Sequence, residues 1–280
     1  MPAGPLLTLA VHEALLAARE AGHAEAEVSL DLGRTQSRVG IGAAHWRWAG
    51  ADYPYPERCR ERTVYHWSGA AFEAVQRYGS ALIKLVPTDW GPPTFEIDGI
   101  KMLPTARVSP LADAQTKVGY VQPRGKRILD TCGGLGYFAV CALQAGAAEI
   151  RSFEKNADVI WVRGLNPWSP ETQPELADAA RYSLTHADVT QALPALPSAS
   201  VDAVLHDPPR FGIAGELYSQ AFYDQLARVL KPHGRLFHYT GTPNKLTSRR
   251  DVPQEVSARL QKAGFRTRIE GDGVVGEKAR

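Results

Sequence analysis

Cysteine is scarce in this sequence, and no metal-binding spacing is present. The 280 residues include three cysteines (Cys59, Cys132 and Cys141), with no CxxC pair and no HExxH segment. An odd number of widely spaced cysteines argues against a disulfide framework and against a four-cysteine zinc site. We therefore expect no structural metal.

Long apolar runs are also missing. No uninterrupted apolar stretch approaches the roughly 18 residues that a membrane-spanning helix needs. Residues 1–22 are partly apolar, but their spacing is typical of a short amphipathic helix, and they lack the basic segment that begins a secretory signal. We expect no membrane partner and a cytoplasmic location.

A strong net charge is the third thing the sequence lacks. Its formal charge is +2, with 22% charged residues and 44% hydrophobic residues. Nucleic-acid-binding domains often have a pI above about 9, so the sequence pI of 8.4 permits such a partner without requiring one. At roughly 100–200 residues per domain, the length fits one large domain or two smaller ones.

Residues 1–110 show the pattern of a small β-rich domain that could recognise substrate. After the first helix, short alternating segments predict half-buried strands. These strands are expected at 26–33, 37–48, 62–69, 81–87 and 95–102. Residues 70–80 resemble a small helix, and residues 51–62 and 88–94 are rich in Pro, Gly and Asp and are expected to form loops.

Residues 111–280 alternate between predicted strands and helices. Strands are expected at 127–130, 149–156, 183–189, 201–209 and 235–241, followed by a closing pair within 265–279; clear helices are expected at 136–146, 219–234 and 252–264. Such alternation predicts an α/β domain with a doubly wound, mostly parallel sheet. Ligands of such sheets bind beyond the carboxyl ends of the strands, near the switch point.

A glycine-rich turn follows the first predicted strand of this region, in Ile128–Tyr137. Glycines let the backbone approach a ligand closely and adopt positive φ. The segment resembles the first motif of class I S-adenosylmethionine-dependent methyltransferases, with Asp130, Gly134 and Gly136 matching and Cys132 standing where the first glycine would be. The resemblance implies a Rossmann-like fold and these four residues as cofactor-binding residues. The alternative is a tight turn without a ligand.

Two acidic residues end the next predicted strands. Glu154 lies about 20 residues past the glycines, where a carboxylate can accept both ribose hydroxyls; the alternative is a surface residue paired with Lys155. Asp188 follows the third strand, and the resemblance places an acidic residue there beside the adenine amine. The alternative for Asp188 is a helix N-cap.

The segment Asp207-Pro208-Pro209-Arg210-Phe211 follows an apolar strand. It resembles the Asp/Asn-Pro-Pro-aromatic signature of methyltransferases that act on planar amino groups, including nucleobase amines. Asp207 and the Pro208 carbonyl would accept hydrogen bonds from the N–H groups of the target amine. The aromatic side chain would stack on a flipped base. Arg210 takes the usual aromatic position and Phe211 follows it. No cysteine lies near this segment along the sequence, which disfavours carbon methylation, and a capped turn is the alternative.

Longer strings extend the likeness over most of residues 80–280. They resemble a group of archaeal and bacterial methyltransferases with the His206–Phe211 motif. What this resemblance implies is methylation of an exocyclic amine in an RNA base, with S-adenosylmethionine as cofactor, RNA as partner and ribosomal cytidine as the leading target.

Several further residues are candidates for contact with substrate. We expect Arg210, Tyr218, His238 and Tyr239 to bind substrate, whereas His206 is expected to pack within the sheet. Arg210, Lys245, Arg249 and Arg250 could contact phosphate. Tryptophans and arginines of the first domain could stack on single-stranded RNA or form its core; these are Trp46, Arg47, Trp48, Arg58, Arg60, Arg62 and Trp67.

Three other functions remain open from the sequence. The same scaffold supports methyltransferases of small molecules or proteins, aminopropyltransferases of the polyamine-synthase type, and non-catalytic RNA-binding proteins. Asp207-Pro208-Pro209 argues against the second, and the glycine-rich motif argues against the third. Oligomeric state is open, with a symmetric dimer the commonest soluble assembly.

Overall fold

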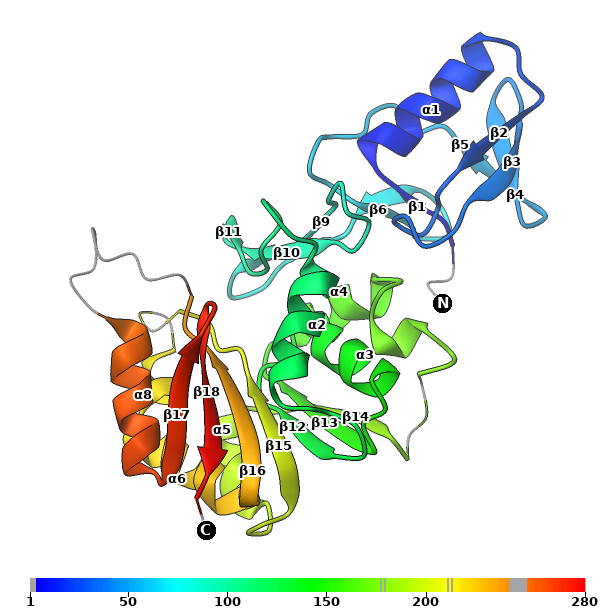
Figure 1. Cartoon of the computed structure of the whole chain (residues 1–280). Helices are drawn as coiled ribbons and strands as arrows, with labels where there is room; N and C mark the ends of the chain where they lie inside the picture. Colours follow the sequence, from blue (N-terminus) through cyan, green and yellow to red (C-terminus); the bar gives the residue numbers. More distant parts are fainter. Residues whose placement is uncertain are drawn as a thin grey trace. The chain divides into compact units, whose positions relative to one another are not determined.

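The computed structural model describes residues 4–176, 178, 180–210, 212, 214–241 and 251–279. The chain divides into two compact units (Figure 1). The first consists of Met1–Leu111 and Trp161–Pro174, and the second of Ala112–Ile160 and Glu175–Arg280. Residues 161–174, expected in the second domain, therefore pack within the first unit.

The first unit contains small antiparallel sheets and one long helix, α1 (Leu9–Glu20), which begins after the N-cap Thr8. One sheet has the order β1 (Leu6–Leu7), β6 (Tyr65–Trp67), β7 (Phe72–Ala74). A second has the order β2 (Glu25–Val28), β3 (Ser37–Ile41), β4 (His45–Trp48), β5 (Ala51–Pro54). The third has the order β11 (Ile100–Lys101), β10 (Thr94–Ile97), β9 (Leu82–Val86), β8 (Gln76–Tyr78).

Two expectations for this unit were wrong. Residues 70–80 form β7 and β8 rather than a helix, because Val75 between them donates its N–H to Val64 and accepts from Leu85. Pairing with two neighbouring strands outweighs the weak helix propensity of this segment. Residues 51–54 form β5 rather than a loop, since Ala49 and Gly50 both take positive φ in a tight hairpin turn.

The core of the first unit is aromatic. Trp46 is completely buried and stacks on Tyr53 with ring centroids 4.8 Å apart. Arg47 lies on the opposite face of β4 and is exposed, paired with Asp52 at 2.8 Å. Trp46 therefore has the core role that the sequence left open.

Residues 161–174 are an integral part of the first unit. Arg163 is fully buried and bonds Glu171 at 2.9 Å. Trp168 donates its indole N–H to the Leu32 carbonyl at 3.0 Å, and the guanidinium of Arg77 lies 4.0 Å from the ring centroid of Trp161. This segment includes the end of α4 (Ala157–Leu165) and the short 3₁₀ helix η1 (Pro170–Thr172).

The second unit is built on one large sheet. Its order is β14 (Tyr182–His186), β13 (Glu149–Glu154), β12 (Arg127–Asp130), β15 (Val201–His206), β16 (Leu230–Tyr239), β18 (Gly273–Lys278), β17 (Phe265–Glu270). The first five are parallel, and β18 runs antiparallel to both its neighbours. The predicted mostly parallel α/β sheet is confirmed.

Helices cover this sheet. They are α2 (Pro110–Tyr120), α3 (Tyr137–Gln144), α5 (Val189–Ala192), α6 (Gln220–Val229) and α8 (Val252–Lys262), with 3₁₀ turns η2 (Leu193–Ala195) and η3 (Gly215–Tyr218). Figure 1 shows α8 beside β17. Phe222, Leu226 and Leu260 from α6 and α8 join Val204 and Leu236 of the sheet in one apolar cluster.

The helix expected at 219–234 ends earlier, at Val229. Leu230 is already extended and begins β16. Pro232, which cannot continue a helix, and His233, with a positive φ of 61°, lie in an irregular part of that strand, where its register with β15 shifts. Within the described ranges, no helix combines the length and apolar character required to span a membrane.

Strand order explains where a ligand would lie. From β12 the chain adds β13 and β14 on one side, and then returns to add β15 and β16 on the other. The switch point therefore lies between β12 and β15. Ligands of doubly wound sheets bind at the carboxyl end of such a switch point.

Candidate functional site

The predicted site residues fall at the carboxyl ends of adjacent parallel strands. Asp130 ends β12 and Glu154 ends β13. Asp188 follows β14, Asp207 follows β15 and Tyr239 ends β16. The topology therefore brings residues more than 100 positions apart to one edge of the sheet.

The glycine-rich turn after β12 has the backbone that its sequence indicates. Gly134 and Gly136 have φ of 47° and 83°, and Gly136 is the N-cap of α3. Gly133 donates its N–H to the Phe153 carbonyl at 2.7 Å, which ties the turn to β13. Cys132 does not take positive φ, so this position does not need glycine. Burial raises the pKa of its thiol well above the ordinary value, which keeps it neutral.

Glu154 connects β13 to the glycine turn. Its Oε2 accepts the Gly134 N–H at 3.0 Å, and its Oε1 accepts the Asn156 N–H at 2.9 Å. A carboxylate offers about four acceptor positions, so two backbone bonds leave capacity for ribose hydroxyls. This geometry fits the predicted role of Glu154.

Asp130 ends β12 just before the glycines of the turn and is fully buried. Its Oδ2 accepts the hydroxyl of Ser152 on the neighbouring strand at 2.8 Å. Asp130 therefore connects the end of β12 to β13. The positive-φ glycines, Asp130 and Glu154 are the residues that could hold the methionine and ribose parts of S-adenosylmethionine.

Asp188 is the N-cap of α5. Its Oδ1 accepts the Thr190 N–H at 2.9 Å and the Thr190 hydroxyl at 2.7 Å, and Lys155 lies 3.5 Å from its Oδ2. Burial opposes ionisation of Asp188, but the Thr190 hydrogen bonds and the Lys155 charge outweigh it and lower its pKa. Asp188 thus caps a helix, as the alternative from the sequence proposed. It does so at the same edge of the sheet as the other strand-end acids.

Asp207 is the first residue after β15 and is mostly buried, with 18% of its side chain exposed. Burial raises its pKa, and the positive charge of Lys117 partly opposes that shift. Two residues later, the Pro209 carbonyl accepts the Tyr218 hydroxyl at 3.0 Å. This bond fixes the turn that carries Asp207 and the two prolines.

The other predicted substrate residues differ in exposure. Arg210 is exposed and Tyr239 is half-buried, whereas Tyr218 and His238 are buried. The hydroxyl of Tyr218 bonds the Pro209 carbonyl in the turn that carries Asp207, and Tyr218 does not lie at the surface. Phe211, Lys245, Arg249 and Arg250 lie outside the described residues.

His238 belongs to a buried polar cluster behind Asp207. Its Nδ1 lies 2.7 Å from the Tyr239 carbonyl and therefore donates, so Nε2 accepts the Tyr223 hydroxyl at 2.9 Å. Its ring meets that of His206 edge-on at 4.4 Å. Both nitrogens of His238 are already bonded, so its side chain supports the site and does not reach substrate.

His206 is bonded in the same manner. Its Nε2 donates to the Leu217 carbonyl at 3.1 Å, and its Nδ1 accepts the Thr131 hydroxyl at 2.6 Å. Burial lowers the pKa of His206 to about 3, so the ring is neutral. As expected, it packs within the sheet, and it links β15 to the glycine turn and to η3.

Sequence reasoning missed a buried lysine against Asp207. Lys117 of α2 is 2% exposed, and its Nζ lies 2.8 Å from Asp113 Oδ2, 3.6 Å from Asp207 Oδ2 and 4.0 Å from Asp272 Oδ2. The same Nζ lies 3.9 Å from the ring centroid of Tyr239. Asp113 and Lys117 are four residues apart, a spacing that usually indicates a surface ion pair, so the sequence held no signal that this pair is buried.

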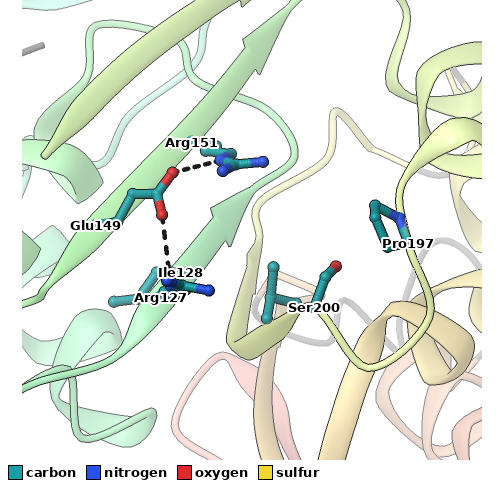
Figure 2. Close-up of a pocket in the computed structure, with 7 residues that line it drawn as sticks. Arg127, Ile128, Glu149, Arg151, Pro197 and Ser200 are labelled. Carbon is teal, nitrogen blue, oxygen red and sulfur yellow. Dashed lines mark hydrogen bonds and ion pairs between the residues drawn. The ribbon is translucent and has the colours of Figure 1, made fainter. Parts of the chain in front are cut away.

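A separate hollow of about 200 Å³ lies at the opposite edge of the sheet. Arg127, Glu149 and Val201, at the amino ends of β12, β13 and β15, line it. Figure 2 shows Glu149 between Arg127 and Arg151, with an ion pair to each. Because ligands bind at the carboxyl ends, this hollow is not the candidate site.

Comparisons with known proteins agree with this fold. No family model matches the chain. The chain is 43% identical over 183 residues to the uncharacterized protein MJ1233 of Methanocaldococcus jannaschii, covering 65% of this chain and 61% of that protein. It is 39% identical over 88 residues to polyamine aminopropyltransferase 2 of Streptomyces coelicolor, covering 31% of this chain and 15% of the relative. The chain thus spans about three fifths of the first relative.

A solved structure of spermidine synthase with the transition-state analogue AdoDATO has a TM-score of 0.58 and 16% identity, with 73% of each chain covered. This likeness establishes the fold. The chain has the Rossmann-like fold of spermidine synthase.

Proposed function

We propose that this chain is an S-adenosylmethionine-dependent methyltransferase that modifies an exocyclic amine of an RNA base. The observation that carries the proposal is the pairing of β12 with β15. These neighbouring strands end in the glycine turn and in Asp207-Pro208-Pro209, respectively. A cofactor on the glycine turn and an amine at Asp207 would therefore meet across the switch point.

The cofactor would be held by the residues that the sequence indicated. The glycine turn and Asp130 would receive the methionine part, Glu154 the ribose and Asp188 the adenine side. When bound, S-adenosylmethionine supplies an electrophilic methyl group on a sulfonium.

The acceptor would be oriented by Asp207 and the Pro208 carbonyl. An exocyclic base amine is a weak nucleophile, because its lone pair is delocalised into the ring. Hydrogen-bond acceptors on its N–H groups favour a nitrogen geometry that points the lone pair at the methyl group. Phe211 is the candidate for stacking on the base, and exposed Arg210 for contact with phosphate. RNA, and cytidine as the leading base, come from the sequence resemblance.

Aminopropyl transfer is the second candidate, on two observations. Spermidine synthase shares the fold, and a polyamine aminopropyltransferase matches part of the sequence. In addition, three carboxylates, including that of Asp207, surround the single ammonium of Lys117. The net negative charge of this group suits a cationic amine acceptor.

One experiment separates these candidates. Purified protein receives either labelled S-adenosylmethionine or its labelled decarboxylated form, with RNA from a strain lacking the gene or with polyamines. A labelled methylated base amine, identified by nucleoside mass spectrometry, supports the proposal. A labelled polyamine would favour aminopropyl transfer, and cofactor binding without label in RNA or polyamine would direct the search to proteins and other small molecules.

Asp207→Ala should lower transfer at least about 100-fold, the scale of losing one positioned polar group at a reacting centre. Asp202→Ala is the matched control, because Asp202 lies at the other end of β15 and pairs with Lys231. Equal losses in the two variants would contradict the role of Asp207.

A further inference from the structure

The geometry points to Lys117 as a positioning residue for the reaction, one that keeps the Asp207 carboxylate charged and oriented toward the acceptor amine. This inference deepens the proposed function and rests on it. The side chain of Lys117 is long and flexible, yet only 2% of it is exposed. A buried ammonium is costly unless it is paired, so its carboxylate partners are an essential part of this arrangement.

The surroundings hold the ammonium in one place. Asp113 of α2 is its nearest carboxylate, at 2.8 Å, and the ring of Tyr239 lies under it at 3.9 Å. Asp207 at 3.6 Å and Asp272 at 4.0 Å face it from the end of β15 and from the turn between β17 and β18. Lys117 thus connects four separate elements at the edge where the acceptor amine would bind.

The charge of Lys117 opposes the effect of burial on Asp207. Burial raises the Asp207 pKa, and the negative charges of Asp113 and Asp272 raise it further, whereas Lys117 lowers it. Burial also disfavours the charged form of Lys117 itself, but the three carboxylates outweigh burial and raise its pKa. Cys132 and Tyr218 also face Asp207, and both are neutral because burial raises their pKa values.

The negative charge of Asp207 would serve the chemistry of amine methylation. The nitrogen–carbon bond forms as the carbon–sulfur bond breaks, and the electron pair of the broken bond stays on sulfur. The nitrogen becomes cationic and must lose a proton. A charged Asp207 can first accept an N–H hydrogen bond and then receive that proton, whereas a protonated Asp207 accepts the hydrogen bond more weakly and cannot take the proton. Lys117 thereby sets the lower pH limit of the reaction.

The test is the pH profile of methyl transfer in Lys117→Met. Loss of the positive charge should raise the Asp207 pKa and move the acid limb up by one pH unit or more. At any pH on the acid limb, the rate should then be about tenfold lower for each unit of that move. The rate should recover toward the wild-type value near pH 9, and cofactor affinity by calorimetry should not change. Lys231→Met, which breaks the Lys231–Asp202 pair at the other end of β15, is the control and should keep the wild-type profile.

A second variant guards against misfolding of Lys117→Met. Asp272→Asn removes a negative charge near Asp207 and leaves Lys117 in place, so it should move the acid limb to lower pH. A uniform loss of rate at every pH in Lys117→Met, or no opposite shift in Asp272→Asn, would overturn the inference.

A readout without turnover separates this inference from the proposed function. Carboxyl ¹³C NMR of labelled aspartates, with Asp207 assigned by Asp207→Asn, follows the Asp207 titration in wild type and in both variants. Absence of methyl transfer by the wild type would overturn the proposed function alone. Unchanged titration of Asp207 in both variants would overturn the role of Lys117.

Discussion

The two ends of β15 carry the same pair of residue types with opposite electrostatic results. At the amino end, Lys231 Nζ lies 2.6 Å from Asp202, and 40% of the lysine side chain is exposed. At the carboxyl end, Lys117 Nζ lies 3.6 Å from Asp207 and is 2% exposed. Burial opposes ionisation of both aspartates, yet the Asp202 pKa is lowered, with help from Lys231 and the Arg127 N–H, whereas the Asp207 pKa is raised.

Both burial and distance differ between these pairs, because the pair at the amino end is more exposed and also shorter. Exposed pairs contribute about 0–1 kcal/mol to stability. Breaking a buried pair leaves an uncompensated charge and costs far more. Changes to the buried polar residues at the carboxyl end of the sheet should therefore affect stability and transfer more than changes to the exposed pairs at the amino end. Three predictions test this difference between the ends.

The largest expected effect is acid sensitivity of the carboxyl end. Native His206 stays neutral to about pH 3, whereas an unfolded histidine protonates near pH 6.5, so its contribution to stability is complete above about 6.5 and is lost as the pH falls. From pH 7 to pH 5 this should lower the free energy of unfolding by about 2 kcal/mol. His238, whose pKa burial also lowers, should add to the loss.

Urea titrations followed by circular dichroism at pH 7 and pH 5 measure this slope. His206→Gln should flatten it, and His233→Gln, at the exposed amino side of β16, should not. An identical slope in wild type and His206→Gln would show that His206 does not stay neutral in the folded protein.

A smaller effect is expected from Tyr218→Phe. The Pro209 carbonyl loses its hydroxyl partner, so the turn that carries Asp207 is held less firmly, and transfer should slow by about tenfold, the equivalent of one ordinary hydrogen bond. Single-turnover kinetics and calorimetry check this, with cofactor affinity expected to stay constant. A change confined to cofactor affinity would contradict the assignment.

The smallest effect is expected at the amino end. Arg151→Ala removes an exposed partner of Glu149 and should alter the free energy of unfolding by less than about 0.5 kcal/mol, with transfer unchanged. A loss of 2 kcal/mol or more in urea titration would show that the two ends are not as different as their burial indicates.

The sequence predicted the second unit well because its signals are local. Apolar runs, the glycine turn and the strand-end acids at Asp130, Glu154 and Asp207 each fall within a few residues, and parallel topology then brings the strand ends together. The first unit was harder to predict, since residues 70–80 become strands through pairing with Val64 and Leu85, which no local pattern contains.

Burial of polar groups was the part of the site that the sequence could not supply. His238 was expected to contact substrate, but its bonds to Tyr223 and the Tyr239 carbonyl are made in the interior. Lys117 and Asp113 have the spacing of a surface pair. Their role depends on Asp207 and Asp272, which lie far along the chain and meet them only in the folded sheet.

The discontinuous first unit has a consequence for the order of events during synthesis. Residues 1–111 leave the ribosome first, but Trp161, Arg163 and Trp168, which complete their packing, follow only after β12, α3 and β13. At roughly 5–20 residues per second, this leaves an interval of several seconds in which Arg77 and the Leu32 carbonyl lack their tryptophan partners. A nascent chain stalled before residue 161 should therefore be more open to protease than one stalled after residue 174 has emerged.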